Sequence, residues 1–144
     1  MTTVQTSATT IASAAAVWRL WSDVENSPAW DTDVAWSRLD GAFEPGARGE
    51  FKLKRGPSLR FVIDEVADDG YANTVRVPGL RVRFTHVFEQ VAPGKLRITH
   101  GAELGGGLGW LAAPLLRRQL ERAMAIALDN FVQLAERSSQ EEAS

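Results

Sequence analysis

The chain contains no cysteine, which excludes disulfide bonds, thiolate metal sites and a cysteine nucleophile. Histidine is nearly as scarce, because only His86 and His100 are present. Two histidines are too few for a usual zinc site, and the spacing places no third ligand beside them. We therefore expect neither a metal nor another cofactor.

Long apolar runs are also missing, and none approaches the length that spans a bilayer. No Lys or Arg precedes Arg19, and Thr and Ser interrupt the first ten residues, unlike the start of a signal peptide. The formal net charge of −2 gives no overall attraction to nucleic acid or to an anionic membrane. We expect a soluble, cytoplasmic protein with no transmembrane segment and no nucleic-acid partner.

The chain length of 144 residues suits one domain with a sizeable core. Hydrophobic residues make up 44% and charged residues 24%, which is ordinary for a globular protein. No linker or internal repeat divides the chain, and only residues 138–144 read as a flexible polar tail. We predict a single domain over residues 1–144.

The first part of the chain predicts a strand followed by two short helical segments. Residues 4–11 are rich in Thr and β-branched side chains, which favours a strand. Ser13 is a suitable N-cap for a helix over residues 14–22, and Ser27-Pro28 indicates a second helical turn or loop. A further strand is expected over residues 34–39.

The middle of the chain alternates apolar and polar residues, the pattern of half-buried strands. Turn signals, among them Pro45-Gly46 and Pro78-Gly79, separate these segments. The expected strands cover residues 51–54, 59–64, 71–77, 80–91 and 95–104.

The last part of the chain predicts one long amphipathic helix over about residues 108–137. Its apolar stripe at three- and four-residue spacing consists of Leu116, Leu120, Ala123, Met124, Ala127, Phe131 and Leu134. Four glycines around its start, Gly105, Gly106, Gly107 and Gly109, indicate a bend or, alternatively, a lid hinge. The stripe needs a partner, and the concave face of a curved antiparallel sheet would leave a cavity beneath the helix.

His86 and His100 lie on the apolar faces of two adjacent predicted strands. If residues 80–91 and 95–104 form a hairpin, one register pairs Glu89 with Arg97 and Arg83 with Glu103. That register places the two imidazoles opposite each other, roughly 5 Å apart at Cβ. Two neutral imidazoles in an apolar pocket would contact a ligand carbonyl or hydroxyl, act as acid or base, or simply fill the core.

The chain has five tryptophans, and Trp30, Trp36 and Trp110 fall near the expected cavity entrance or helix start. Each is a candidate for core packing, rim packing or ligand contact. The residues that we expect to bind ligand are Trp30, Trp36, Phe51, Leu53, Phe61, Phe84, His86, Phe88, His100, Trp110, Leu120, Met124 and Ala127.

Charged residues give weaker signals. Arg48, Arg55 and Arg60 are candidates to hold an anionic head group in a cavity. Asp31 and Asp33 beside Trp30 read as turn or capping residues. Basic residues on the polar strand faces lack interleaved aromatics, so they indicate protection of sheet edges rather than nucleic-acid binding.

The order of elements resembles the START-like or Bet v 1-like (SRPBCC) superfamily, and within it the polyketide cyclase/dehydrase-type proteins. The resemblance covers nearly the whole chain. It is carried by Val17-Trp18, Asp23, Trp30-Asp31, the loop from Pro45-Gly46 to Gly49, and the helix entry from Gly109-Trp110 to Pro114 and Arg118, with Leu134-Ala135-Glu136 at the helix end.

This resemblance implies an α+β helix-grip fold, in which a curved antiparallel sheet of about seven strands wraps around the C-terminal helix. It implies binding of a mostly apolar small molecule, such as a polyketide, isoprenoid or lipid, between sheet and helix. One alternative is a cyclase or dehydratase that uses His86 or His100 as acid or base, although the single tyrosine, Tyr71, argues against phenol-dependent chemistry. Another is a protein-interaction module of the Hsp90 co-activator type. A homodimer is a further alternative for its oligomeric state.

Overall fold

The computed structural model describes residues 2–143, without the side chains of residues 110, 112 and 143. The expected order of elements is confirmed. It runs β1 (Thr2–Thr10), α1 (Ala14–Ser22), the 3₁₀ helix η1 (Val24–Ala29), β2 (Val34–Asp40), β3 (Arg48–Leu53), β4 (Ser58–Ala67), β5 (Gly70–Val77), β6 (Leu80–Ala92), β7 (Lys95–Gly105) and α2 (Gly109–Ala143).

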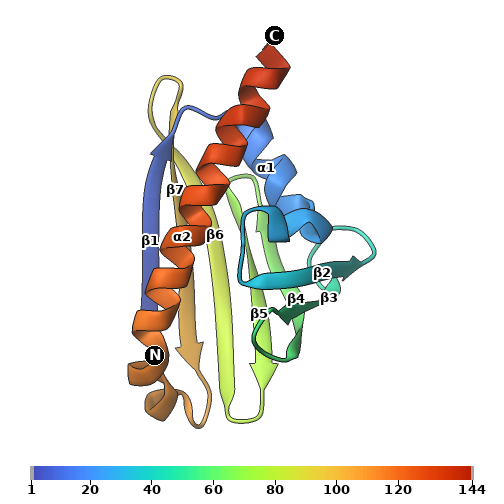
Figure 1. Ribbon diagram of the computed structural model, residues 1–144, viewed down its shortest axis with the longest axis vertical. Coiled ribbons are helices and arrows are strands. Elements are labelled where there is room, and N and C mark those ends of the chain that lie inside the picture. Colours follow the sequence, from blue (N-terminus) through green and yellow to red (C-terminus); the bar gives the residue numbers. More distant parts are fainter. Residues whose placement is uncertain (1, 144) are drawn as a thin grey trace.

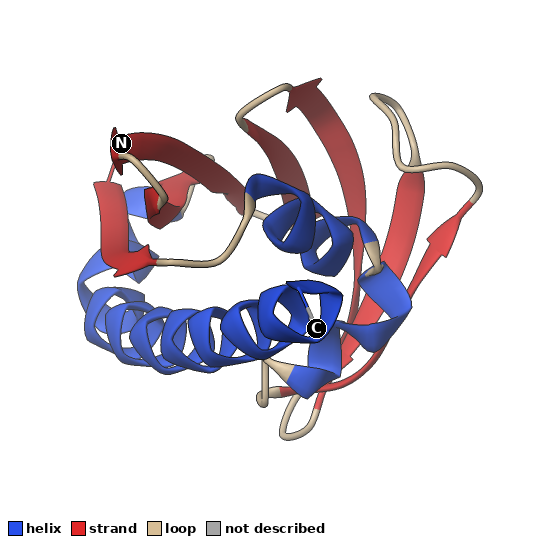
Figure 2. Ribbon diagram, turned by 90° about the horizontal axis from the view of Figure 1, so that it is seen from above, coloured by secondary structure: helices blue, strands red, loops and turns tan. Residues whose placement is uncertain are grey.

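The strands form one seven-stranded antiparallel sheet in the order β1-β7-β6-β5-β4-β3-β2. Consecutive strands from β2 to β7 are hairpin neighbours, and β1 closes the sheet against β7. Figure 1 shows α2 crossing the sheet diagonally, and Figure 2 shows the sheet curving around it. The helix-grip fold expected from the sequence is therefore confirmed.

Local capping fixes the first helix. The Ser13 hydroxyl accepts a hydrogen bond from the backbone N–H of Ala16 at 3.1 Å, as expected of an N-cap. The buried face of α1 carries Val17 and Trp21, at four-residue spacing. As a result, the Trp21 indole points inward between the sheet and α2.

The predicted register of β6 and β7 is confirmed. His86 pairs with His100, Glu89 with Arg97 and Arg83 with Glu103. On the outer face the Arg97–Glu89 ion pair measures 3.1 Å and the Arg83–Glu103 pair 3.7 Å. Because side chains alternate along strands, this register sends both imidazoles to the inner face.

Helix α2 is longer than the sequence indicates. A polar tail was expected after Arg137, but the helix continues to Ala143. The extension is held to the N-terminal region, where the backbone N–H of Ser13 donates to Ser139 Oγ at 2.9 Å and Arg19 pairs with Glu142. These tertiary contacts hold a segment that composition alone assigns to a tail.

None of the helices in the described part of the chain has the length and apolar character to cross a bilayer.

The glycines before α2 form a bend, one of the two roles expected of them. Gly106 has a φ of 100°, a conformation that side chains disfavour. The backbone N–H of Leu108 then donates to the carbonyl of Gly79 at 2.7 Å. This contact joins the start of α2 to the β5–β6 turn.

The interior contains two apolar clusters. The first lies under the C-terminal half of α2 and includes Trp21, Ile98, Leu128 and Phe131. The second lies among β3, β4 and β5 around Phe61, Ile63 and Val75. The space between these clusters forms the candidate site.

Candidate functional site

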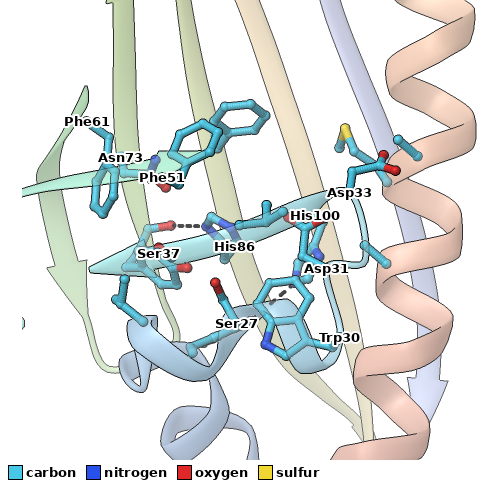
Figure 3. A pocket seen from close by; sticks show the side chains of 18 of the residues that line it. Ser27, Trp30, Asp31, Asp33, Ser37, Phe51, Phe61, Asn73, His86 and His100 are labelled. Carbon is cyan, nitrogen blue, oxygen red and sulfur yellow. Dashed lines mark hydrogen bonds between the residues drawn. The ribbon is translucent and has the colours of Figure 1, made fainter. Parts of the chain in front are cut away.

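A cavity of about 230 Å³ lies between the inner face of the sheet, the η1–β2 segment and α2. Figure 3 shows Phe51, Phe61 and Asn73 on one side of it and Trp30 and Asp31 on the other. Its lining consists of Trp21, Val24, Ser27, Trp30, Asp31, Asp33, Val34, Ser37, Phe43, Phe51, Leu53, Phe61, Ile63, Tyr71, Asn73, Phe84, His86, His100, Gly101, Leu120, Ala123, Met124 and Ala127.

Four residues from the apolar stripe of α2, two of them alanines, line this cavity. Leu120, Ala123, Met124 and Ala127 line it, whereas Phe131 one turn later is fully buried in the first cluster. Alanines leave space that a leucine would fill. Ala123 and Ala127 therefore leave room for the hollow between Leu120, Met124 and the sheet.

Most residues expected to bind ligand lie at this cavity. Ten of the thirteen line it: Trp30, Phe51, Leu53, Phe61, Phe84, His86, His100, Leu120, Met124 and Ala127. Of the other three, the side chain of Trp110 lies outside the described residues. Trp36 and Phe88 are placed elsewhere.

Trp36 was expected at the cavity, but its side chain is 41% exposed. The cause is a register irregularity between Val34 and Trp36 in the β2–β3 pair. A bulge shifts the alternation by one residue, so Ser37 takes the inward position after Val34. Strict alternation from Val34 would have pointed Trp36 inward.

Phe88 does face inward, but it belongs to the packed core. Its ring centroid lies 5.8 Å from that of Trp21, within the cluster under the C-terminal half of α2. The aromatic packing fills this part of the interior, and Phe88 does not line the cavity.

The two histidines have defined tautomers because of their partners. The Trp21 indole N–H donates to His100 Nε2 at 3.2 Å, so Nε2 carries no proton and the neutral ring carries it on Nδ1. His86 Nδ1 lies 3.4 Å from the Tyr71 carbonyl oxygen, which only accepts, so Nδ1 holds the proton there. Among the described residues, His86 Nε2 and His100 Nδ1 have no protein partner. The pair therefore offers a ligand one hydrogen-bond acceptor, His86 Nε2, and one donor, His100 Nδ1–H.

Both imidazoles are kept neutral. Burial lowers the pKa of His86 to about 4, although its hydrogen bond to the Tyr71 carbonyl opposes the shift. Burial, followed by the proximity of His86, lowers the pKa of His100 well below its ordinary value. Their ring centroids are 4.9 Å apart, so two positive charges would repel strongly. At neutral pH these rings act as hydrogen-bonding groups and not as cations.

Asp31 is a site residue that the sequence assigned to a turn. Its carboxyl does accept a hydrogen bond from the Asp33 backbone N–H, as in a turn. However, it also lines the cavity, and burial followed by the nearby Asp33 charge raises its pKa to about 6. No signal in the sequence separates a turn aspartate from one that turns toward a cavity.

Tyr71 is the second residue that the sequence left without a role. Its ring stacks on the His86 imidazole, with centroids 4.0 Å apart and planes within 4°. Burial and the Asp31 charge raise the pKa of its hydroxyl, so the phenol stays protonated. Among the described residues, the Tyr71 hydroxyl and the side chains of Ser27, Ser37 and Asn73 have no hydrogen-bond partner, and all four residues line the cavity.

The described lining contains no Lys or Arg. Arg48 and Arg60, candidates for an anionic head-group site, lie along a separate groove on the outer face with Arg38 and Arg76. Arg55 is exposed and lines neither space. The expectation of an inward arginine is therefore wrong, and the charged groups of the cavity are carboxyls.

The cavity wall is densely aromatic. The Trp21 ring stacks on Phe131 with centroids 6.0 Å apart, and Trp30 meets Phe131 edge-to-face at 5.0 Å. The Trp30 indole N–H is fully buried and has no hydrogen-bond partner among the described residues. Burying a donor without a partner lowers the free energy of unfolding, so this part of the cavity wall is not optimised for stability.

A curved antiparallel sheet wrapped around a C-terminal helix, with short helices after the first strand and a cavity between the layers, is the START-like or Bet v 1-like fold. Residues 1–136 match the family described as polyketide cyclase / dehydrase and lipid transport, and the chain belongs to this family. Its fold is that of a hydrophobic-ligand-binding protein. None of the curated proteins compared with the chain matches it.

Solved structures of low sequence identity share this fold. Norcoclaurine synthase from Thalictrum flavum aligns with a TM-score of 0.74 at 11% identity, covering 92% of each chain. The hypothetical protein jhp0584 from Helicobacter pylori gives 0.76 at 13% identity, covering 93% of this chain and 88% of its own. A START superfamily protein from Mycobacterium smegmatis gives 0.68 at 12% identity, covering 96% of this chain and 97% of its own.

Proposed function

We propose that this chain binds a compact, uncharged and mostly apolar ring compound that carries at least one hydroxyl or carbonyl. The observation that carries the proposal is the pairing of an aromatic-lined cavity with two buried imidazoles, each of which has one nitrogen without a partner among the described residues. A purely apolar occupant would leave both nitrogens unsatisfied.

Cavity size favours a small ring system over a long acyl chain. Pockets for drug-sized ligands occupy roughly 300–1,000 Å³, whereas an engineered cavity of about 150 Å³ holds benzene. The present volume of about 230 Å³ lies between these values and suits one or two fused rings. A compact aromatic polyketide fits this size better than an extended lipid. The Thalictrum enzyme, a structural neighbour, has been solved with dopamine and hydroxybenzaldehyde, which are single-ring compounds.

Charge argues against an anionic ligand. Asp31 and Asp33 line the cavity, and no described lining residue is a Lys or Arg. A fatty-acid carboxylate would therefore enter a site without a counter-ion, next to carboxyls that already repel each other. A neutral compound avoids this cost.

The test compares naphthol with naphthalene, two compounds of the same ring size, by titration calorimetry. The hydroxyl of naphthol is expected to donate to His86 Nε2 and to increase affinity roughly tenfold. His86→Ala and His100→Ala proteins are expected to lose most of this difference while still binding naphthalene. Absence of binding by either compound, or equal affinities in the wild-type protein and both variants, would reject the proposal.

A further inference from the structure

We propose that the cavity transfers a proton at a carbon next to a ketone, with Asp31 as the general base and the Tyr71 hydroxyl as the donor to the ketone oxygen. This inference rests on the proposed function, because it places the ketone of a compact ring compound in the same cavity. It assigns the acid–base role to Asp31 instead of to the histidines.

The setting of Asp31 is that of a base and not of a structural anion. Its carboxyl lines a largely apolar cavity, and no described residue forms an ion pair with it. Its protein partner is the backbone N–H of Asp33. A carboxylate left without a cation in such a place gains by taking up a proton, and its pKa of about 6 leaves both forms populated near neutrality.

The titratable groups that line the cavity with Asp31 come from one loop and three strands. Asp33 lies on the same loop, Tyr71 on β5, His86 on β6 and His100 on β7. The α2 residues at the cavity are apolar, and Lys54, whose backbone N–H bonds the Asp33 carbonyl, is exposed.

The histidines are poor candidates for the base. The Trp21 N–H occupies Nε2 of His100, which is the nitrogen that would otherwise accept a proton. His86 keeps Nε2 available, but burial holds its pKa near 4. A base works best when its pKa lies near the operating pH, which favours Asp31 over His86.

Tyr71 supplies the complementary group. Its hydroxyl has no hydrogen-bond partner among the described residues. Burial, followed by the Asp31 charge, raises its pKa, so the phenol and the Asp31 carboxyl interact electrostatically. Stacking on His86 restricts the ring, which favours a fixed hydroxyl direction. A protonated phenol and an ionisable carboxyl at one cavity match the needs of enolate formation.

The step balances without a further reactant. The Asp31 carboxylate takes the proton from the carbon beside the carbonyl, and the C–H electron pair forms a carbon–carbon double bond. The carbonyl π pair moves onto oxygen, where the Tyr71 O–H hydrogen-bonds the resulting enolate. Return of a proton, or of a deuteron from exchanged solvent, from the Asp31 carboxyl to carbon regenerates the ketone.

The test follows exchange of the hydrogens beside the carbonyl of tetralone, a two-ring ketone, for deuterium in heavy water by NMR. The wild-type protein is expected to accelerate exchange over buffer alone. Asp31→Asn is expected to lower the protein-dependent rate about 100-fold, and Tyr71→Phe about tenfold or more. Asp40→Asn, a carboxylate on the outer face, is the matched control and is expected to match the wild type.

The pH profile identifies the base. With Asp31 as the base, the rate rises with pH through a midpoint near 6. Removing the neighbouring charge by Asp33→Asn lowers the Asp31 pKa, so this midpoint moves to lower pH while exchange persists. A purely structural role of Asp31 predicts no such movement. A wild-type midpoint near 4 that persists in Asp31→Asn would assign the base to His86 and overturn the proposal.

Binding separates this inference from the proposed function. If Asp31→Asn binds naphthol like the wild type but exchanges tetralone equally fast, the base assignment is wrong and ligand binding stands. If wild-type protein binds naphthol without any exchange above buffer, proton transfer is rejected. If Asp31→Asn fails to fold, the Asp33→Asn midpoint decides, because an unchanged midpoint would reject Asp31.

Discussion

The Trp21 indole N–H donates to Nε2 of His100 at 3.2 Å, joining α1 to β7 across the inner face of the sheet. Trp21 is 1% exposed and His100 is 5% exposed, so water does not replace this bond. It fixes the tautomer of His100 and also positions the indole against Phe131 of α2. This one hydrogen bond therefore both orients a core side chain and sets which nitrogen of His100 donates into the cavity.

Trp21→Phe should remove the N–H and leave His100 Nε2 as a buried acceptor without a partner. We expect the free energy of unfolding to fall by about 1–3 kcal/mol. The pKa of His100 should rise, because Nε2 becomes free to bind a proton. Urea unfolding measures the first effect and an NMR titration of the imidazole the second. Trp36→Phe at an exposed position is the control, and equal losses in both proteins would contradict the role of the bond.

Acid should destabilise the fold through the histidines. Their pKa values are lower in the folded than in the unfolded protein, so the unfolded state binds more protons below about pH 6.5. Stability is therefore complete above this value and is lost as the pH falls toward 4, by about 3 kcal/mol for His86 alone. Urea unfolding at a series of pH values should show this loss, and His86→Gln should reduce it.

Asp31 should act in the opposite direction. Its folded pKa is raised, so the folded state binds more protons between its ordinary value of 3.8 and about 6. This uptake offsets part of the histidine effect in the same window. Asp31→Asn should therefore make acid destabilisation steeper than in the wild type. An unchanged or shallower slope in the same unfolding series would show that the carboxyl is not shifted in the fold.

Ala123→Leu should fill the cavity from the helix side. The added side chain occupies space that the ligand needs, so affinity for naphthol should fall at least tenfold while the protein stays folded. Ala125→Leu, an exposed position two residues later, is the matched control and should bind normally. Calorimetry gives the affinities and circular dichroism the folded state. Equal affinities in the two variants would place the ligand elsewhere.

Tetralone binding should quench tryptophan fluorescence through the indoles at the cavity. Trp21 and Trp30 line it, whereas Trp36 is exposed on β2. Quenching should persist in Trp36→Phe and should weaken in Trp30→Phe. If Trp36→Phe abolished the signal instead, the bulge in β2 would not separate this indole from the ligand.

Periodicity predicted most of this fold because the alternation of strands and the stripe of α2 are local properties. The His86–His100 register followed from the charge pairs Arg97–Glu89 and Arg83–Glu103, whose attraction is encoded in the sequence. The same reasoning failed at Trp36, because one inserted residue reverses the faces of a strand and no residue pattern announces the bulge. Sequence reasoning also ended α2 too early. The last residues of α2 are held by contacts with Ser13 and with Arg19 of α1, which are distant in the chain.

The amino-acid sequence alone determined the order of elements, the inward faces of β6 and β7 and the apolar stripe of the long helix, because each depends on neighbours a few residues apart. Tertiary structure decided how the cavity is charged and which titratable groups line it. Asp31 and Tyr71 are forty residues apart in the chain, and only folding buries both at one cavity, where loss of water raises the pKa of each.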